Sequence, residues 1–310
     1  MALTSSGTAT EPSQAGLGQV RPELSRRERL RRLPVDRLFY LAVGVLVGLL
    51  LVGIFAPLIR PHDLLEQSIR DSLTSPVWFA DGYRGFPFGT DQVGRDILSN
   101  VMSGIRVSLM VAFFASAIAM TIGLTVGTIA GYFRGWLDGS LMRAVDLQLA
   151  LPTELIALFV MATLGQGLWK LILVIGFTGW AGYARTVRGS ILSEREQEYI
   201  DAARAIGMSD LRLILRHLLP NVLTPVAILV AVQMPGVIML EATLSFLGLG
   251  IPVTTPSLDL TISRGFDVLF SGHWWVVVFP GLALLLITFS INVIADSLRD
   301  VLDPHFRKKA

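Results

Sequence analysis

The chain has 310 residues, of which 52% are hydrophobic and 16% are charged, and its mean hydropathy is +0.61. A water-soluble globular protein of this composition would expose too much apolar surface, so we expect an integral membrane protein. The net charge is only +2, which gives no support to nucleic-acid binding. The absence of cysteine excludes disulfides and cysteine-ligated metals, and the four histidines lack zinc-protease spacing, so no metal site is predicted.

Six apolar runs are candidates for membrane-spanning helices. A span needs about 20 residues at a rise of about 1.5 Å per residue, and the first run satisfies this without any charged residue. The runs lack the two-residue alternation of barrel strands, so the sequence predicts an all-α integral membrane protein with six transmembrane helices. The runs are residues 38–59, 107–133, 147–164, 171–184, 222–250 and 274–294.

Arginine and lysine are concentrated in segments that we assign to the cytoplasm. The stretch RPELSRRERLRRLPVDR precedes the first run, FRKKA ends the chain, and the segments after the second and fourth runs carry several arginines. Both termini are therefore predicted to be cytoplasmic. We divide the chain into a partly disordered cytoplasmic tail (1–37), a first helix with an external loop (38–104), a five-helix transmembrane domain (105–296) with a polar loop at about 193–220, and a cytoplasmic C-terminal tail (297–310).

Two glycine-containing patterns indicate local structure. In the external loop, GTDQVGRD is typical of an ordered turn that leads into a helix. In the second run, Gly123, Gly127 and Gly131 recur every four residues, with Gly135 just past its end, and form one stripe along a helix. Such a stripe allows a second helix to approach closely, so we expect it to have a packing role.

The fifth run carries the residues that we predict to line a translocation pathway. Pro225 and Pro235 each remove a helix hydrogen bond, and a kinked helix is suited to line a pathway. Glu241 is costly to bury in a membrane and is expected to face a cavity or the bundle interior. It would either meet a substrate ammonium group or serve the structure, by pairing with an arginine or capping a helix. The predicted pathway residues are Gln233, Pro235 and Glu241.

The pattern of the polar loop predicts two short helices. The loop comprises EYIDAARAIGMSDLRLILRHLLPN and the residues before it. Ser193 and Glu196 form a capping-box pattern that predicts a helix start, and Gly207 is suited to end that helix. Ser209 and Asp210 are expected to cap a second helix that runs to Pro220. The loop would either dock another protein or lie on the bilayer, although its acidic residues disfavour an anionic lipid surface. The predicted apolar face of the first helix comprises Tyr199, Ala202, Ala203 and Ile206.

The stretch DAARAIGMSDLRLILRHLLP resembles the EAA coupling loop of ABC-importer permeases. The motif positions are occupied by Asp201, Ala202, Ala203, Gly207, Leu219 and Pro220. Asp201 stands where glutamate is commoner, and His217 stands where isoleucine is usual. The resemblance implies that this loop couples to an ATPase subunit, and the coupling residues it predicts are Tyr199, Asp201, Ala202, Ala203, Arg204, Gly207 and Pro220.

Further segments narrow the resemblance to the C-type permease subunit of dipeptide, oligopeptide and nickel ABC importers. They are FGTDQVGRD, WAGYARTVRGSIL, EATLSFLGLGI and DSLRDVLDP, and the similar region covers roughly residues 35–305. PSLDLTISRGF departs from the tryptophan-glycine pair usual in relatives. The resemblance implies a type I ABC-importer permease fold in a bacterial or archaeal plasma membrane. It implies as partners a second homologous permease, two ATP-binding subunits, an extracytoplasmic binding protein and membrane lipid, with no nucleic acid.

The chain is expected to be a non-catalytic transport subunit. It has no phosphate-binding P-loop, since none of its three lysines follows a glycine, so ATP and Mg²⁺ are expected at the partner ATPases and no cofactor on this chain. Peptides are the first expectation for the cargo, with nickel or another small solute as alternatives. A membrane enzyme would need clustered catalytic groups inside the spans, and an ion-driven carrier would show more buried ionisable groups and an internal repeat.

Overall fold

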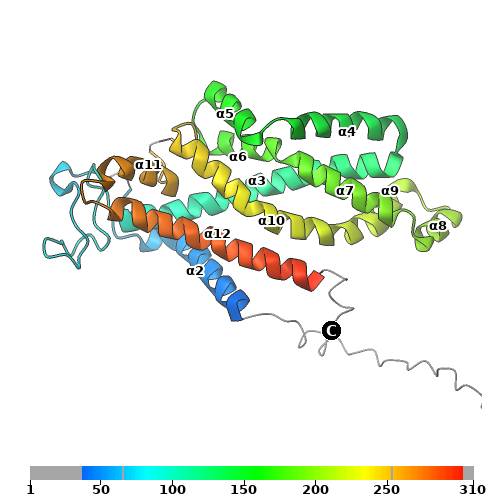
Figure 1. Cartoon of the computed structure of the whole chain (residues 1–310). Coiled ribbons are helices and arrows are strands. Elements are labelled where there is room, and N and C mark those ends of the chain that lie inside the picture. The colour runs from blue at the N-terminus through cyan, green and yellow to red at the C-terminus, as the bar shows by residue number, and fades with distance from the viewer. Residues whose placement is uncertain (1–36, 65, 253, 303–310) are drawn as a thin grey trace, which may run out of the picture. The chain divides into compact units, whose positions relative to one another are not determined.

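The computed structural model describes residues 37–64, 66–252 and 254–302, and these form a bundle of helices (Figure 1). Within them the only β-type pairing is an isolated bridge between Thr90 and Asp96. Most of the two predicted tails lies outside the described residues. The elements are α2 (Arg37–Ile59), η1 (Ile69–Asp71), α3 (Ile97–Phe133), α4 (Gly135–Ala150), α5 (Thr153–Leu164), α6 (Leu168–Thr178), α7 (Trp180–Glu194), α8 (Glu198–Ala205), α9 (Asp210–Leu213), the π-helical turn η2 (Ile214–Leu218), α10 (Leu219–Phe246), α11 (Leu258–Leu269) and α12 (Trp275–Leu302).

Four helices of the described chain are long and apolar enough to cross a membrane. They are α2, α3, the continuous helix Asp210–Phe246 that joins α9 to α10, and residues 275–301 of α12. The pair α4 and α5 is a fifth candidate, but the two helices meet at 85°. The structure therefore supports four or five spans by length and composition, against the six predicted.

The two predicted spans that differ most are the third and the fourth. The run 147–164 is not one straight helix, because it crosses the bend between α4 and α5, where Leu151 is extended and Pro152 follows it. Proline disfavours the helical conformation in the residue before it, which explains the break. The run 171–184 is divided at Gly179 between α6 and α7, and α6 has only 11 residues. Neither α6 nor α7 spans a bilayer alone.

α3 lies at the centre of the bundle and packs closely against α7, as the glycine stripe predicts. A Cβ atom on Gly127 would lie 2.5 Å from the carbonyl oxygen of Ala184 and 2.7 Å from Cβ of Val187. Gly131 is similarly enclosed by Ile191, and Gly123 by Tyr183. The packing role is confirmed for these three glycines. It is wrong for Gly135, which faces open space and has a φ of +62° because it lies at the break between α3 and α4.

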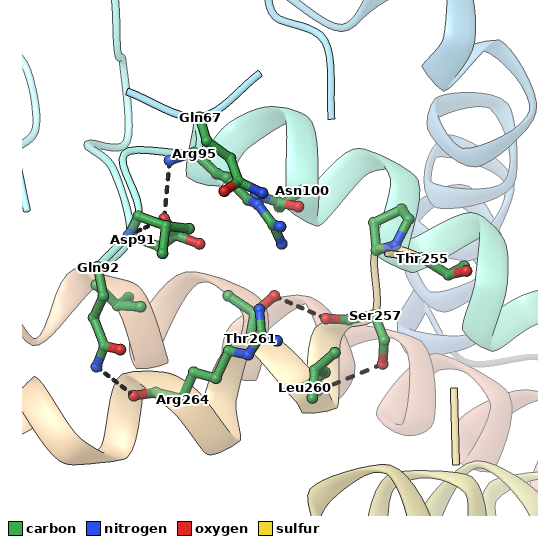
Figure 2. Close-up of a pocket in the computed structure, with 13 residues that line it drawn as sticks. Gln67, Asp91, Gln92, Arg95, Asn100, Thr255, Ser257, Leu260, Thr261 and Arg264 are labelled. Atoms are coloured by element: carbon green, nitrogen blue, oxygen red, sulfur yellow. Dashed lines mark hydrogen bonds between the residues drawn. The ribbon is translucent and has the colours of Figure 1, made fainter. Parts of the chain in front are cut away.

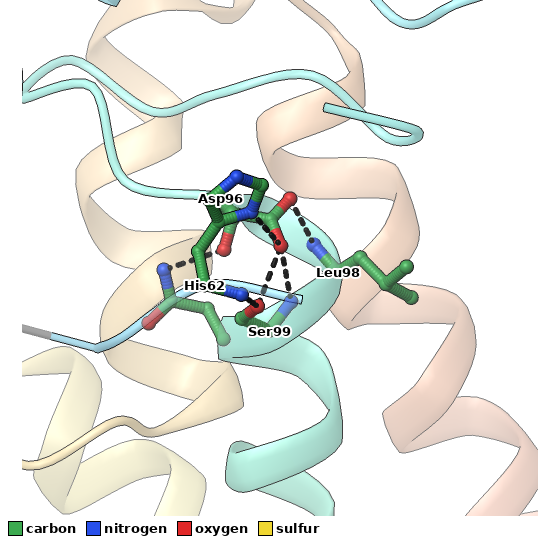
Figure 3. Close-up of polar contacts among 5 residues, drawn as sticks. His62, Asp96, Leu98 and Ser99 are labelled. Atoms are coloured by element: carbon green, nitrogen blue, oxygen red, sulfur yellow. Dashed lines mark hydrogen bonds and ion pairs between the residues drawn. The ribbon is translucent and has the colours of Figure 1, made fainter. Parts of the chain in front are cut away.

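The turn predicted before the second span is confirmed. Gly89 and Gly94 have φ angles of +79° and +77°, which glycine adopts readily. Asp96 then caps α3: its carboxylate accepts from the backbone N–H of Leu98 at 3.3 Å and from the N–H and Oγ of Ser99 at 3.1 and 2.6 Å (Figure 3). This cap explains why α3 begins at Ile97, before the apolar run that was predicted to start at residue 107.

Candidate functional site

The polar loop forms a protrusion at one end of the bundle, opposite the long connecting segment of residues 60–96 (Figure 1). The protrusion consists of α8, a reversal at Gly207 and α9. Gly207 has a φ of +83°, so the predicted left-handed helix end is confirmed. The predicted helix start at Ser193 is wrong, because Ser193 lies inside α7 and α8 begins only at Glu198. The glutamate of the capping-box pattern, Glu196, instead forms an ion pair with Arg134 at 2.8 Å.

The buried face of α8 differs from the predicted one. Ile200 is fully buried and Ala203 is 7% exposed, and both pack against Leu213 and Leu218. Of the four predicted apolar-face residues, Ala203 alone points inward, whereas Ile206 is 80% exposed. The face of α8 that points away from the bundle comprises Glu198, Asp201, Ala202 and Ala205. Of the two alanines of the motif, Ala203 is therefore buried and Ala202 is exposed.

Tyr199 and Arg204 take part in contacts that orient the protrusion. The hydroxyl of Tyr199 donates to the carboxylate of Glu194, and the Asn221 side-chain amide donates to both groups at 2.8 Å. Burial raises the pKa of the Tyr199 hydroxyl, and the hydrogen bond to Glu194 raises it further, so the phenol stays protonated as the donor. Arg204 pairs with Asp201 at 3.4 Å. The Tyr199 contacts connect α8 to the end of α7 and the start of α10. The Arg204–Asp201 pair lies within α8, and the Arg204 guanidinium also lies over the ring of Tyr132 in α3, 5.9 Å from its centre.

The second helix of the loop does not end at Pro220. Pro220 is the second residue of α10, and the π-helical turn η2 immediately precedes this helix. Proline cannot donate to the carbonyl four residues earlier and its ring crowds that carbonyl, so a wider turn at this place relieves the conflict. One helix therefore runs from the protrusion at Asp210 to Phe246 in the bundle.

A cavity of about 370 Å³ lies between α4–α7 and α10. Gln233 lines it together with Thr178, Tyr183 and Glu154. Of the three predicted pathway residues, Gln233 alone is in this cavity. Pro235 is buried beside it in α10. Gly182 leaves room for Gln233, because a Cβ at Gly182 would lie 3.2 Å from Nε2 of Gln233.

Glu241 is fully buried and lines none of the cavities described for this chain. Its carboxylate accepts hydrogen bonds from Ser108 at 3.2 Å and Ser245 at 3.3 Å. Among the described residues, no arginine or lysine forms an ion pair with it. In this conformation Glu241 thus joins α3 to α10 through serine hydroxyls.

Glu154, an exposed carboxylate in the first turn of α5, was not among the predicted pathway residues. It is the one acidic residue among the described residues that line the cavity with Gln233. The bend at Pro152 turns the first residues of α5 toward α10, and this bend was not predicted. The Leu151–Pro152 pair inside an apolar run is the signal that indicates it.

Residues 123–308 match the family described as binding-protein-dependent transport system inner membrane component. The chain is 35% identical over 289 residues to the dipeptide transport system permease protein DppC of Bacillus subtilis (strain 168), with 93% of this chain and 88% of that protein covered. It is 39% identical over 274 residues to DppC of Escherichia coli (strain K12), with 86% and 90% covered.

The fold is also similar to that of a solved transporter. A chain of the MetNI methionine ABC transporter, in an inward-facing conformation, superimposes with a TM-score of 0.54 at 17% identity. The superposition covers 67% of this chain and 98% of that chain. Together with its apolar spanning helices, these similarities identify a multi-pass membrane protein. The chain belongs to the family of binding-protein-dependent transport system inner membrane components.

Proposed function

We propose that this chain is one permease subunit of an ATP-driven importer of di- or oligopeptides. The observation that carries the proposal is the identity of 35% with a dipeptide permease along 93% of the chain. The subunit forms half of a translocation pathway, and a second homologous permease supplies the other half. An extracytoplasmic binding protein delivers the peptide, and two ATPase subunits with ATP and Mg²⁺ drive the cycle. The chain itself catalyses no reaction.

The proposed topology places α8 and both termini in the cytoplasm of a bacterial or archaeal cell. α6 and α7 together complete a sixth span, and residues 105–296 form the transmembrane domain. The long connecting segment then lies outside, where the binding protein arrives. This topology keeps the arginine-rich segments on the cytoplasmic side.

Coupling is proposed to occur through the exposed face of α8. Asp201 and Ala202 are exposed on a helix that is fixed to the bundle by Ile200 and Ala203. A small side chain at Ala202 allows an ATPase groove to approach the helix backbone. Because α10 continues from the protrusion without a loop, movement of the protrusion tilts α10 and changes the cavity around Gln233. Pro235 and Glu241 belong to the proposed pathway through their position on that helix.

The proposed function predicts ATP-dependent peptide uptake by the assembled transporter. Proteoliposomes that contain this chain, its partner permease and both ATPases are expected to accumulate radiolabelled dialanine when the binding protein is outside and ATP is inside. Omission of ATP or of the binding protein is expected to abolish accumulation. Uptake that persists without ATP and depends on an ion gradient would contradict the proposal, and so would uptake of Ni²⁺ but not of dialanine.

A tryptophan at position 233 is expected to block the pathway. Gln233→Trp fills part of the cavity between Tyr183 and α10. Uptake should fall by about tenfold or more, which corresponds to about 1.4 kcal/mol on the barrier to passage. Gln233→Leu is the matched control, since it removes the amide but adds no bulk, and it should retain most of the uptake. Both variants should keep the ATPases bound; equal uptake by Gln233→Trp and the wild type would place the pathway elsewhere.

A further inference from the structure

A second cavity, of about 320 Å³, lies at the end of the bundle that carries the long connecting segment (Figure 2). Its walls come from the turn before α3 and from α11 with the residues that lead into it. Two arginines line it, Arg95 from the turn and Arg264 from α11. Figure 2 shows the guanidinium of Arg95 extending into the space between the two elements. This cavity is separate from the one that contains Gln233.

Neither arginine has a partner for its guanidinium among the described residues. No ion pair and no side-chain hydrogen bond involves either group, and Nε of Arg95 is buried without a hydrogen-bond partner. Each guanidinium carries five N–H donors in a planar fork. A buried donor without a partner is costly, so a site that holds Nε of Arg95 beside a second unpaired guanidinium is suited to an acceptor from outside the chain.

The two positive charges also act on each other. Burial lowers the pKa of Arg264, and the nearby charge of Arg95 lowers it further, whereas Asp91 raises it. Asp91 is the one acidic residue among the described residues that line the cavity. One of its carboxylate oxygens accepts hydrogen bonds from the backbone N–H groups of Val93 and Arg95, both at 2.9 Å. This oxygen therefore already stabilises the turn. The lining therefore keeps one uncompensated positive charge.

The cavity walls are held in place before any ligand arrives. The side-chain amide of Gln92 donates to the backbone carbonyl of Arg264 at 2.8 Å and ties the turn to α11. The Asp91 contacts fix the backbone at Arg95, as described above. Asn100 and Gln67 add amide groups to the lining, and the Asn100 amide already donates to the backbone carbonyl of Asp96 at 3.0 Å. Because the backbone at both arginines is already fixed, an anion that binds there has to order only the two arginine side chains.

We propose that Arg95 and Arg264 bind the C-terminal carboxylate of the peptide cargo at the external end of the subunit. Arginine forks match the two oxygens of a carboxylate, and the Gln67 amide in the same lining matches the adjoining peptide carbonyl. The inference rests on the proposed function, because it is a peptide importer that presents such a carboxylate on this side. An acidic side chain of the binding protein and a free phosphate also present anionic oxygens to arginine. The experiment below distinguishes both of them from the peptide carboxylate.

The test uses an arginine-specific dicarbonyl reagent on the complete transporter in lipid nanodiscs. Mass spectrometry of proteolytic peptides reads the labelling rate of Arg95 and Arg264, with exposed Arg70 as the internal reference. Dialanine and N-acetylalanine, which both carry a free carboxylate, should slow the labelling of Arg95 and Arg264 severalfold and leave Arg70 unchanged. Dialanine amide and an equal concentration of inorganic phosphate should give no comparable protection.

Four outcomes would overturn the proposal. They are protection by none of the compounds, equal protection by dialanine amide, equal protection by phosphate, and protection by the peptide-free binding protein where dialanine gives none. The last would assign the arginines to an acidic residue of the binding protein. Wild-type transporter that imports dialanine but shows no protection defeats this inference alone, whereas wild-type transporter that imports no peptide defeats the proposed function itself.

Substitutions provide a second measurement. Arg264→Gln and Arg95→Gln should raise the half-saturating peptide concentration for uptake by about tenfold, the loss expected for one charge-assisted contact. Arg70→Gln is the matched control, because Arg70 is exposed on η1 and outside the cavity. Retention of the ATPases by each variant shows that the subunit has folded. Variants with wild-type uptake at every peptide concentration would contradict a role in cargo binding.

Discussion

Ala202→Trp is expected to release the ATPase partner while the permease still inserts and folds. Ala202 is exposed on the outer face of α8, so the indole adds no strain inside the chain and instead occupies the space that a docked protein needs. An obstruction at the centre of an interface typically costs about 2 kcal/mol or more, which is a loss of about 30-fold in affinity. ATPase co-purification and peptide uptake should both fall to that extent, with unchanged permease yield and melting temperature.

Two matched substitutions define what this result means. Ala80→Trp makes the same change at an exposed alanine in the connecting segment, at the other end of the bundle, and should leave ATPase co-purification intact. Ala203→Trp should instead lower permease yield, because Ala203 is packed against Leu213 and Leu218. Normal ATPase retention by Ala202→Trp would mean that the partner docks on another surface.

Gly127→Leu is expected to prevent stable packing of α3 against α7. A Cβ atom at this position already meets the Ala184 carbonyl at 2.5 Å, and both neighbours are helix backbone or branched side chain with little room to move. Overpacking of a rigid core costs about 1–3 kcal/mol, and a leucine between two helices in contact lies at the upper end of that range. The measurements are the folded yield after detergent extraction and the midpoint of thermal unfolding, both of which should fall.

Gly189 offers the matched control on α7 itself. No atom lies within 4 Å of a Cβ built there, so Gly189→Leu should keep its folded yield. The alanine variants extend the comparison: Gly189→Ala should be neutral or stabilising by up to about 1 kcal/mol, because alanine favours the helix, whereas Gly127→Ala should destabilise. Equal melting temperatures for Gly127→Leu and Gly189→Leu would contradict the prediction, because they would mean that the close contact between α3 and α7 at Gly127 does not contribute to stability.

Much of the architecture could be predicted because bilayer physics constrains it. Long apolar runs had to be helices, and the glycines at 123, 127 and 131 indicated a close helix pair that the structure confirms. The family followed from the motifs of the polar loop. The helix breaks at Pro152 and Gly179 were not predicted, since hydropathy measures how apolar a run is and not whether its backbone stays straight.

The candidate site was predicted less completely, and α8 shows why. Its eight residues make little more than two turns, so three- and four-residue spacing alone allows several apolar faces. The buried face of α8 is determined by Ile200, which packs against Leu213 and Leu218. These contacts join Ile200 to residues outside the helix and are not visible in its local spacing. For the same reason the sequence did not indicate that Arg95 and Arg264 line one cavity, because they lie far apart in the chain. Ser193 and Glu196 satisfied a local capping rule that the longer α7 overrode.

The uninterrupted helix from Asp210 to Phe246 has a thermodynamic consequence. Its 37 residues correspond to about 55 Å at about 1.5 Å per residue, so one continuous helical body bears the end of the protrusion and Gln233 in the cavity wall. If that body has two orientations, the ATPase bound at one end and the peptide bound at the other both shift the equilibrium between those orientations. Linkage then requires reciprocity: by whatever factor the nucleotide state of the ATPase changes the affinity for peptide, peptide in the cavity changes the affinity for the ATPase in that state by the same factor.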